Sequence, residues 1–236
     1  MQSRPTLLLV HGSWHGPWCW ERLIPELDNL GLTSATVALP SCGSDPAVLG
    51  TVSDDADAAG AAFADIAGDV VVVGHSYGGV VITEAQFDSR ARHLVYLGAF
   101  MPDTAQSLFD LLPPRWIPRY IRDHSDGSTT VDPAMAIDSF FADCDPSTAQ
   151  WAASMLCRHN GINNVTPVTR ASWRRQTSTY VVLTDDRAWP AAEQRKLATR
   201  ATEQREMQTS HSPFLSRPVE LAVLLDDIVA RVTHDH

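Results

Sequence analysis

The chain has 236 residues, of which 44% are hydrophobic and 19% charged, and its formal net charge is −10 at pH 7. These values are typical of a globular protein with one sizeable core, and the acidic balance argues against nucleic acid or an anionic membrane as the main partner. Four scattered cysteines without a C-x-x-C pair predict neither a zinc site nor a disulfide framework, so we expect reduced thiols in the cytoplasm. The apolar segments are too short for a signal peptide or a membrane span, and we expect neither.

Segments typical of strands and of helices alternate along most of the chain. The first half predicts strands at Thr6–Val10, Thr33–Leu39, Val70–Val73 and Arg92–Gly98, with helices at Trp18–Leu30 and from Thr51 to about Gly68. The last third predicts strands at Tyr180–Thr184 and Glu206–Gln208, with helices at Pro190–Arg200 and from Ser216 towards the carboxyl terminus. Pro25 lies inside the first helix, where a proline kinks or breaks the hydrogen-bond ladder. This alternation predicts an α/β fold with a mostly parallel sheet covered by helices on both faces.

The segment from about Met101 to Trp173 interrupts this alternation, because it shows no strand signal and is rich in aromatic residues. It leaves the predicted sheet after the carboxyl end of one strand, and ligand sites of open α/β sheets lie at those ends. We therefore expect residues 101–174 to form a helical lid on a core made of residues 1–100 and 175–236. The alternative is that its apolar residues only form a small core of their own; they are Phe109, Trp116, Met135, Phe140, Phe141, Trp151, Met155 and Trp173.

The most informative motif is Gly74-His75-Ser76-Tyr77-Gly78, which follows the valine strand and precedes a helix-compatible apolar segment. A Gly-x-Ser-x-Gly sequence in this context predicts a sharp turn from strand to helix that holds the serine at its apex. A Cβ atom at position 74 or 78 would crowd that turn, and Gly79 would let the helix sit close to the sheet. The motif therefore predicts that Ser76 is a nucleophile, placed at a helix amino terminus that favours negative charge.

A serine hydroxyl needs a general base to act as a nucleophile, and the chain has nine histidines. His211 follows the last predicted strand, where the base of an elbow fold is expected, in the loop Thr209–Pro213. We expect His75 to be structural, because it points into the turn, and His93 to be solvated at a strand entrance. The sequence therefore predicts His211 as the base.

The acid that orients the base should follow a preceding strand at its carboxyl end. Asp185 and Asp186 both satisfy this condition, and since adjacent side chains point to opposite sides, only one of them can face His211. Spacing alone leaves both candidates open.

Two backbone N–H groups are needed to hold the oxyanion that forms during acyl transfer. One is expected from Tyr77, directly after the nucleophile, and the other from the loop after the first strand, where Ser13 is the natural donor. Gly12 would let this backbone approach the substrate closely.

Four blocks carry a resemblance to a known family, and they cover residues 10–20, 74–79, 185–190 and 210–214. They resemble the α/β-hydrolase family of plant methylesterases, the salicylate-binding esterase and the hydroxynitrile lyases, with its bacterial esterase branch. The resemblance implies the α/β-hydrolase fold, Asp186 as the acid of the triad, and Ser13 and Tyr77 as the oxyanion donors. The chain departs from the family pattern at Trp189, where an aliphatic residue is usual.

The expected activity is hydrolysis of a carboxylic ester through a Ser-His-Asp triad and an acyl-enzyme intermediate, without a cofactor or a metal ion. An aromatic lid favours a small, largely apolar ester substrate. The oligomeric state stays open between a monomer and a homodimer. The residues expected to line the substrate pocket are Gly12, Trp116, Phe140, Trp151 and Trp189.

Two other functions are compatible with the same fold: cyanohydrin cleavage as in a hydroxynitrile lyase, and non-catalytic binding of a small ligand by a receptor. The lyases of the family carry a lysine directly after the catalytic histidine and a threonine after the first-strand histidine. This chain has Ser212 and Gly12 at those positions, which favours ester hydrolysis.

Overall fold

The computed structural model describes residues 4–113 and 118–234, and it is built around a six-stranded parallel sheet. The strand order is β10-β9-β5-β4-β1-β2, so the chain starts one strand from an edge, adds β2 at that edge and then proceeds to the opposite edge. The strands are β1 (Thr6–Val10), β2 (Ser34–Val37), β4 (Val70–His75), β5 (Ala91–Leu97), β9 (Ser178–Leu183) and β10 (Glu203–Met207). All six strands predicted from the sequence are present, and β10 begins three residues earlier than expected.

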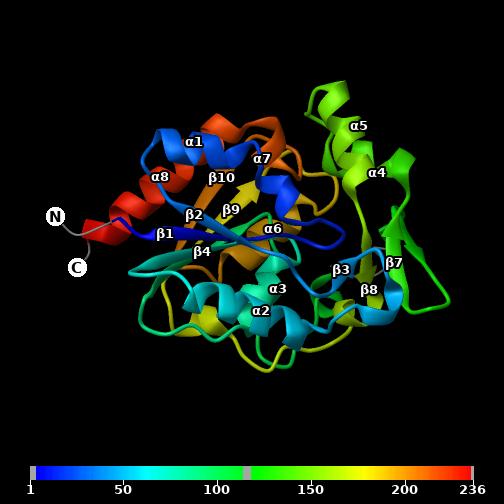
Figure 1. The fold of residues 1–236 in the computed structure, drawn as a ribbon, viewed down its shortest axis with the longest axis horizontal. Helices are drawn as coiled ribbons and strands as arrows, with labels where there is room; N and C mark the ends of the chain where they lie inside the picture. Colours follow the sequence, from blue (N-terminus) through cyan, green and yellow to red (C-terminus); the bar gives the residue numbers. More distant parts are fainter. Residues whose placement is uncertain (1–3, 114–117, 235–236) are drawn as a thin grey trace.

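Helices cover both faces of this sheet (Figure 1). Alternate strand residues enter two separate cores, as the period of a strand requires: Leu7 and Leu9 face one side, and Leu8 and Val10 the other. The first face is covered by α1 (Leu23–Asn29), α7 (Pro213–Ser216) and α8 (Pro218–His234). The second face is covered by α2 (Val52–Ala64), α3 (Gly78–Glu84) and α6 (Ala191–Ala198).

The first predicted helix is divided in the structure. A 3₁₀ turn, η1 (Pro17–Trp20), precedes α1, and the break lies at residues 21–22 rather than at Pro25. Pro25 falls in the first turn of α1, where its missing N–H group would have had no partner within the helix, so the helix tolerates it.

Residues 101–174, called the insertion below, contain strands that the sequence did not predict. Helices α4 (Pro133–Phe140) and α5 (Pro146–Met155) accompany β6 (Ile121–Asp123), β7 (Ser128–Val131) and β8 (Arg158–Asn160). With β3 (Cys42–Gly43) these strands form a second, antiparallel sheet in the order β3-β8-β7-β6. The expectation of a purely helical segment was therefore wrong, because strands this short and polar carry no recognisable alternation.

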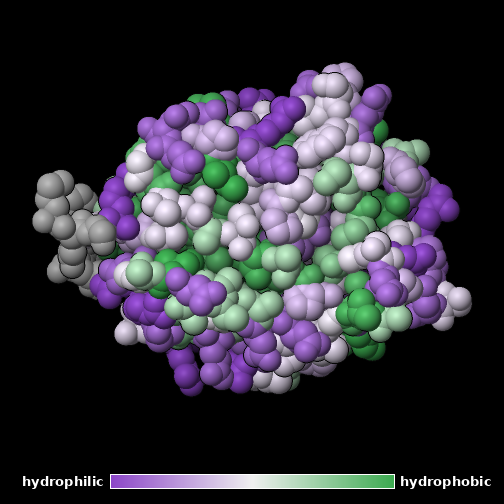
Figure 2. Space-filling model, viewed as in Figure 1, coloured by the Kyte–Doolittle hydropathy of each residue, from purple (hydrophilic) through white to green (hydrophobic). Residues whose placement is uncertain are grey.

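Four short 3₁₀ turns complete the described elements, and three of them lie within the insertion. They are the 3₁₀ turns η2 (Pro46–Val48), η3 (Phe109–Leu111), η4 (Gly161–Asn164) and η5 (Ser172–Arg174). Figure 1 shows the insertion with α4, α5, β7 and β8 on one side of the core. In the view of Figure 2, hydrophilic residues dominate the rim of the molecule, and hydrophobic residues form a band across its middle.

Across residues 4–113 and 118–234, none of the helices has the length and apolar character needed to span a bilayer.

The turn between β4 and α3 is packed more tightly than any side chain would allow. A Cβ atom on Gly74 would lie 2.6 Å from the carbonyl oxygen of Gly78, and one on Gly78 would lie 2.5 Å from that of Val10. A Cβ atom on Gly79 would lie 2.2 Å from the carbonyl oxygen of Phe100. The prediction that glycine is required at these positions is therefore confirmed.

We expect Gly79→Ala to lower the free energy of unfolding by more than about 2 kcal/mol, because the methyl group would overlap the main chain at Phe100. Urea denaturation followed by circular dichroism measures the change. Gly60→Ala in α2 is the matched control: its nearest neighbour would be 3.6 Å away, and alanine, the better helix former, should be neutral or stabilising by up to about 1 kcal/mol. Equal stability of the Gly79 variant and the wild type would contradict the close approach.

Candidate active site

Ser76 occupies the apex of the turn between β4 and α3 in a strained conformation. Its φ angle is +53°, in the left-handed region that residues other than glycine rarely adopt. The side chain is half-buried, while both neighbours, His75 and Tyr77, are fully buried. The loop after β1 also passes close to the serine, since a Cβ atom on Gly12 would lie 2.9 Å from the Cβ of Ser76. The geometry agrees with the sharp turn predicted from the motif.

The structure brings His211 and Asp186 together. The distance between His211 Nδ1 and Asp186 Oδ2 is 2.8 Å, and both side chains are buried. The other carboxylate oxygen of Asp186 accepts the backbone N–H groups of Ala188 and Trp189 at 2.8 and 2.9 Å. Asp185, the alternative candidate, is exposed and donates its backbone N–H to the carbonyl of Thr209. Of the two adjacent carboxylates, only Asp186 contacts the histidine.

Gln194 holds the Asp186 carboxylate from behind. Its amide nitrogen donates to Asp186 Oδ2 at 2.8 Å and to the carbonyl of Trp189 at 2.6 Å, and its amide oxygen accepts the N–H of Leu183. This side chain is fully buried in α6, a helix that we expected only to cover the sheet. No sequence signal identified it, because a single glutamine in a polar helix normally faces solvent.

His75 supports the backbone of the loop that carries His211. Its Nε2–H donates to the carbonyl oxygen of His211 at 2.8 Å, and the two rings lie 4.6 Å apart. Burial holds the pKa of His75 well below its usual range, so the ring is neutral. This agrees with the structural role expected for His75.

His93 differs from its expected solvated state. It is buried, and its ring nitrogens lie 2.8 Å from the hydroxyl groups of Thr177 and Thr179. Burial lowers the pKa of His93 to about 4. The expectation was wrong because β9 packs beside β5 and covers this strand entrance.

Two backbone N–H groups, one in the turn and one in the loop after β1, have no acceptor in the part of the chain that the structure describes. Within residues 4–113 and 118–234, the N–H groups of Ser13 and Tyr77 donate to no protein acceptor. The loop that carries Ser13 is fixed by two neutral histidines: His15 Nδ1 donates to the carbonyl of Ser13 at 2.8 Å, and His11 Nδ1 donates to the carbonyl of Gly12 at 2.9 Å. Such free donors beside a serine can bind a developing oxyanion.

Asp55 is a buried carboxylate that fixes the side chain of Tyr77. The Tyr77 hydroxyl donates to Asp55 Oδ2 at 2.7 Å, and the backbone N–H of Ser41 donates to Asp55 Oδ1 at 2.8 Å. Burial raises the pKa of Asp55 to about 6, although these hydrogen bonds oppose the shift. In the sequence Asp55 is indistinguishable from an exposed first-turn acid of α2, so its contact with the elbow was not predicted.

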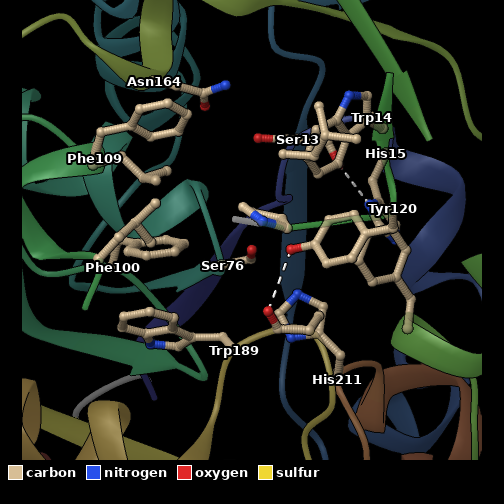
Figure 3. Close-up of a pocket in the computed structure, with 16 residues that line it drawn as sticks. Ser13, Trp14, His15, Ser76, Phe100, Phe109, Tyr120, Asn164, Trp189 and His211 are labelled. Atoms are coloured by element: carbon tan, nitrogen blue, oxygen red, sulfur yellow. Dashed lines mark hydrogen bonds between the residues drawn. The ribbon is translucent and has the colours of Figure 1, made fainter. Parts of the chain in front are cut away.

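Ser76 and His211 line a small cavity whose wall is mainly apolar. Figure 3 shows aromatic side chains on both sides of it: Phe100, Phe109 and Trp189 on one, Trp14 and Tyr120 on the other. The insertion supplies half of the wall, and its contributing residues are Leu108, Phe109, Leu112, Pro118, Tyr120, Ile121, Phe140 and Asn164.

The five expected pocket residues divide as follows. Phe140 and Trp189 line the cavity, and Gly12 lies beneath Ser76 without lining it. Trp151 packs edge-on against Trp18 at 5.4 Å instead, because α5 turns this side chain towards η1. Trp116 lies outside the described residues. In the part of the chain that the structure describes, no group of three histidine, cysteine, aspartate or glutamate side chains converges on a metal position.

Comparison with known proteins identifies the fold. A model of the alpha/beta hydrolase family matches residues 7–224. The alpha/beta hydrolase nvfD of Aspergillus novofumigatus (strain IBT 16806) is 29% identical over 232 residues, covering 91% of this chain and 92% of the relative. A carbendazim hydrolyzing esterase of Nocardioides sp. (strain SG-4G) is 38% identical over 112 residues, covering 45% of this chain and 46% of the relative. A solved pyrethroid hydrolase from Sphingobium faniae JZ-2 has a TM-score of 0.84 at 19% identity, covering 97% of this chain and 98% of that one, which shows a shared fold.

Asp55→Asn should remove a pH-dependent penalty from the folded protein. Burial raises the pKa of Asp55 from 3.8 to about 6. Between about pH 4 and 6 the folded protein therefore keeps a proton on Asp55 that the unfolded chain has already lost. The free energy of unfolding of the wild type, taken relative to the variant, should therefore fall by about 1.4 kcal/mol per pH unit between about pH 4 and 6 and stay constant above about pH 7. Urea denaturation of both proteins across this range tests the sign, and parallel curves would contradict it.

Proposed function

The chain belongs to the alpha/beta hydrolase family, and from that premise we propose that it is a carboxylesterase-type serine hydrolase of a small, largely apolar ester. One observation carries the proposal: the Asp186–His211 hydrogen bond of 2.8 Å lies at the wall of the cavity into which Ser76 projects. A half-buried serine in a strained turn, next to a carboxylate-oriented imidazole, has the parts that nucleophilic acyl transfer needs.

In the proposed first half-reaction, Ser76 Oγ attacks the ester carbonyl carbon while His211 Nε2 takes the hydroxyl proton. The Asp186 carboxylate holds the proton on Nδ1 and stabilises the imidazolium that forms. The oxyanion accepts the two free backbone N–H groups, those of Ser13 and Tyr77. Collapse of the tetrahedral intermediate expels the alcohol, which leaves with the proton from His211.

In the second half-reaction, His211 removes a proton from a water molecule, which attacks the acyl-enzyme carbonyl. The same two N–H groups hold the second oxyanion, and the proton returns from His211 to Ser76 Oγ as the acid leaves. All groups in this scheme come from the chain itself, and the cavity wall is mainly apolar, which suits an ester of low polarity.

Cyanohydrin cleavage is the second candidate on this fold, and two positions favour ester hydrolysis over it. Departing cyanide requires a positive charge near the base, but Ser212 follows His211 and residues 209–215 contain no lysine or arginine. A Cβ atom at position 12 would lie 2.9 Å from the Cβ of Ser76, so this turn does not accommodate the threonine that the family's lyases have there.

We also propose that the insertion acts as the lid of this site and that residues 1–100 and 175–236 form the catalytic core. Eight lining residues of the cavity come from the insertion, which supports this division. The cytoplasm remains our proposed compartment, because Cys19, Cys42, Cys144 and Cys157 are all free thiols.

A panel of p-nitrophenyl esters graded by acyl length tests the activity, and a serine-directed phosphonate tests the nucleophile. We expect turnover of short aryl esters and a single covalent adduct on Ser76, detected by mass spectrometry of the intact protein and its peptides. An unlabelled protein that binds small apolar ligands without turnover would instead support a receptor function.

We expect Ser76→Ala to lower kcat/KM for the best ester at least about 10³-fold, because the serine supplies the attacking atom and the triad acts as a unit. Thermal unfolding of the variant controls for folding and should match that of the wild type, since the change removes only a hydroxyl that makes no hydrogen bond within the described residues. Retention of near-normal turnover would refute the assignment of the nucleophile.

Replacing Asp186 by Asn should reduce kcat far more than the same change at Asp185. An amide at position 186 cannot accept the His211 Nδ1–H as a carboxylate does, so the wrong tautomer is favoured and a loss of about 10³- to 10⁴-fold is expected. The exposed Asp185 is the matched control, with an expected change of less than about threefold. The reverse order of the two losses would move the acid to Asp185.

A further inference from the structure

Two polar side chains in the cavity have no role in the proposed reaction and no hydrogen-bond partner among the residues that the structure describes. They are the Ser13 hydroxyl and the Asn164 amide, and each residue is only 5% exposed. Within the described ranges, neither side chain makes a hydrogen bond, whereas the Tyr120 hydroxyl donates to the carbonyl of Ala188 and the Trp14 indole N–H to Thr129.

Nearly buried amides and hydroxyls are normally hydrogen-bonded, because leaving them unpaired costs free energy. Asn164 ends η4 of the insertion, and its neighbours Asn160 and Asn163 both use their side-chain amides to bind main-chain carbonyls of residues 49–50. Asn164 differs from them by facing the cavity, where Figure 3 shows it beside Phe109 and on the side opposite His211. An unpaired amide in this position is suited to bind a polar group of a ligand.

The place of His211 indicates which part of an ester would reach this amide. The alcohol oxygen must lie within hydrogen-bond distance of His211 to receive its proton, so the alcohol part occupies the cavity next to that residue. The acyl part is the other carbon substituent of the carbonyl and extends away from His211. It therefore points towards the side of the cavity that holds Ser13 and Asn164.

We propose that the Asn164 amide N–H and the Ser13 hydroxyl bind a second carbonyl oxygen in the acyl part of the substrate, so that the enzyme prefers esters of oxo acids over those of plain hydrocarbon acids. A carbonyl oxygen has two lone pairs and can therefore accept hydrogen bonds from both donors. The inference rests on the proposed esterase function and adds the substrate class. Asn164 is a specificity-determining residue in this scheme and takes no part in the bond-making steps.

Three pairs of p-nitrophenyl esters test the proposal. One member of each pair has a ketone at the penultimate carbon of a five-, six- or seven-carbon acyl chain. In the other member, a CH(CH3) group takes the place of the ketone carbonyl. The wild type should prefer the ketone in at least one pair. In Asn164→Leu and in Asn164→Asp, which lack the amide donors, the ratio of kcat/KM for ketone to hydrocarbon should fall at least about tenfold relative to the wild type.

Comparing ratios between proteins cancels the intrinsic reactivity of each ester. Phe109→Leu is the matched control, because it alters the apolar wall next to Asn164 without touching a polar group and should change both members of a pair by the same factor. Ratios within about twofold of the wild type in both Asn164 variants, with normal labelling at Ser76, would overturn the inference and leave the esterase proposal standing. Absence of turnover for all six esters, with Ser76 unlabelled, would overturn both.

Discussion

The close approach of three backbone segments at Ser76 is the constraint on which the rest of the site depends. The carboxyl end of β1, the turn after β4 and the segment after β5 meet at distances that a Cβ atom would fill, which is why Gly78 and Gly79 follow the serine. A non-glycine residue at φ +53° costs about 1–3 kcal/mol and persists only where its surroundings fix it. Here β4, buried throughout, lies between β1 and β5, and α3 is buried over its whole length.

The buried histidines His11, His15, His75 and His159 around this turn are neutral. Burial lowers the pKa of His11 to about 4 and those of His15 and His159 to about 3, so these rings stay neutral at neutral pH. The neutral rings of His11 and His15 then bind the main chain: both donate from Nδ1 to carbonyl oxygens, and His11 Nε2 accepts the N–H of Leu39. Of the histidines around the turn, His211 is the one with a carboxylate partner within the described residues, so in the proposed reaction the proton that leaves Ser76 is stabilised on that ring.

The sequence predicted those parts of the fold whose pattern is local. Valine runs and the Gly-x-Ser-x-Gly turn are readable because each depends on neighbouring residues, whereas the expected order of serine, acid and histidine was taken from the elbow fold. The choice of Asp186 over Asp185 required the family resemblance, since two adjacent carboxylates differ only in the direction that the tertiary structure gives them. Asp55, Gln194 and Asn164 look like ordinary surface residues in the sequence, and only long-range packing makes them part of the site.

Hydrogen bonds connect the insertion to the loops that carry Asp186 and His211, which limits how it could move as the proposed lid. Asp143, between α4 and α5, accepts the backbone N–H of Ser210 at 3.0 Å and the Thr209 hydroxyl at 2.8 Å, directly before His211. Tyr120 reaches the carbonyl of Ala188 at 3.3 Å, two residues after Asp186. A displacement of this part of the insertion would therefore pull on the loops that carry Asp186 and His211. In the proposed enzyme, substrate entry that preserves the Asp186–His211 contact would use the wall formed by Phe109, Leu112 and Asn164, which also border a second, outer groove.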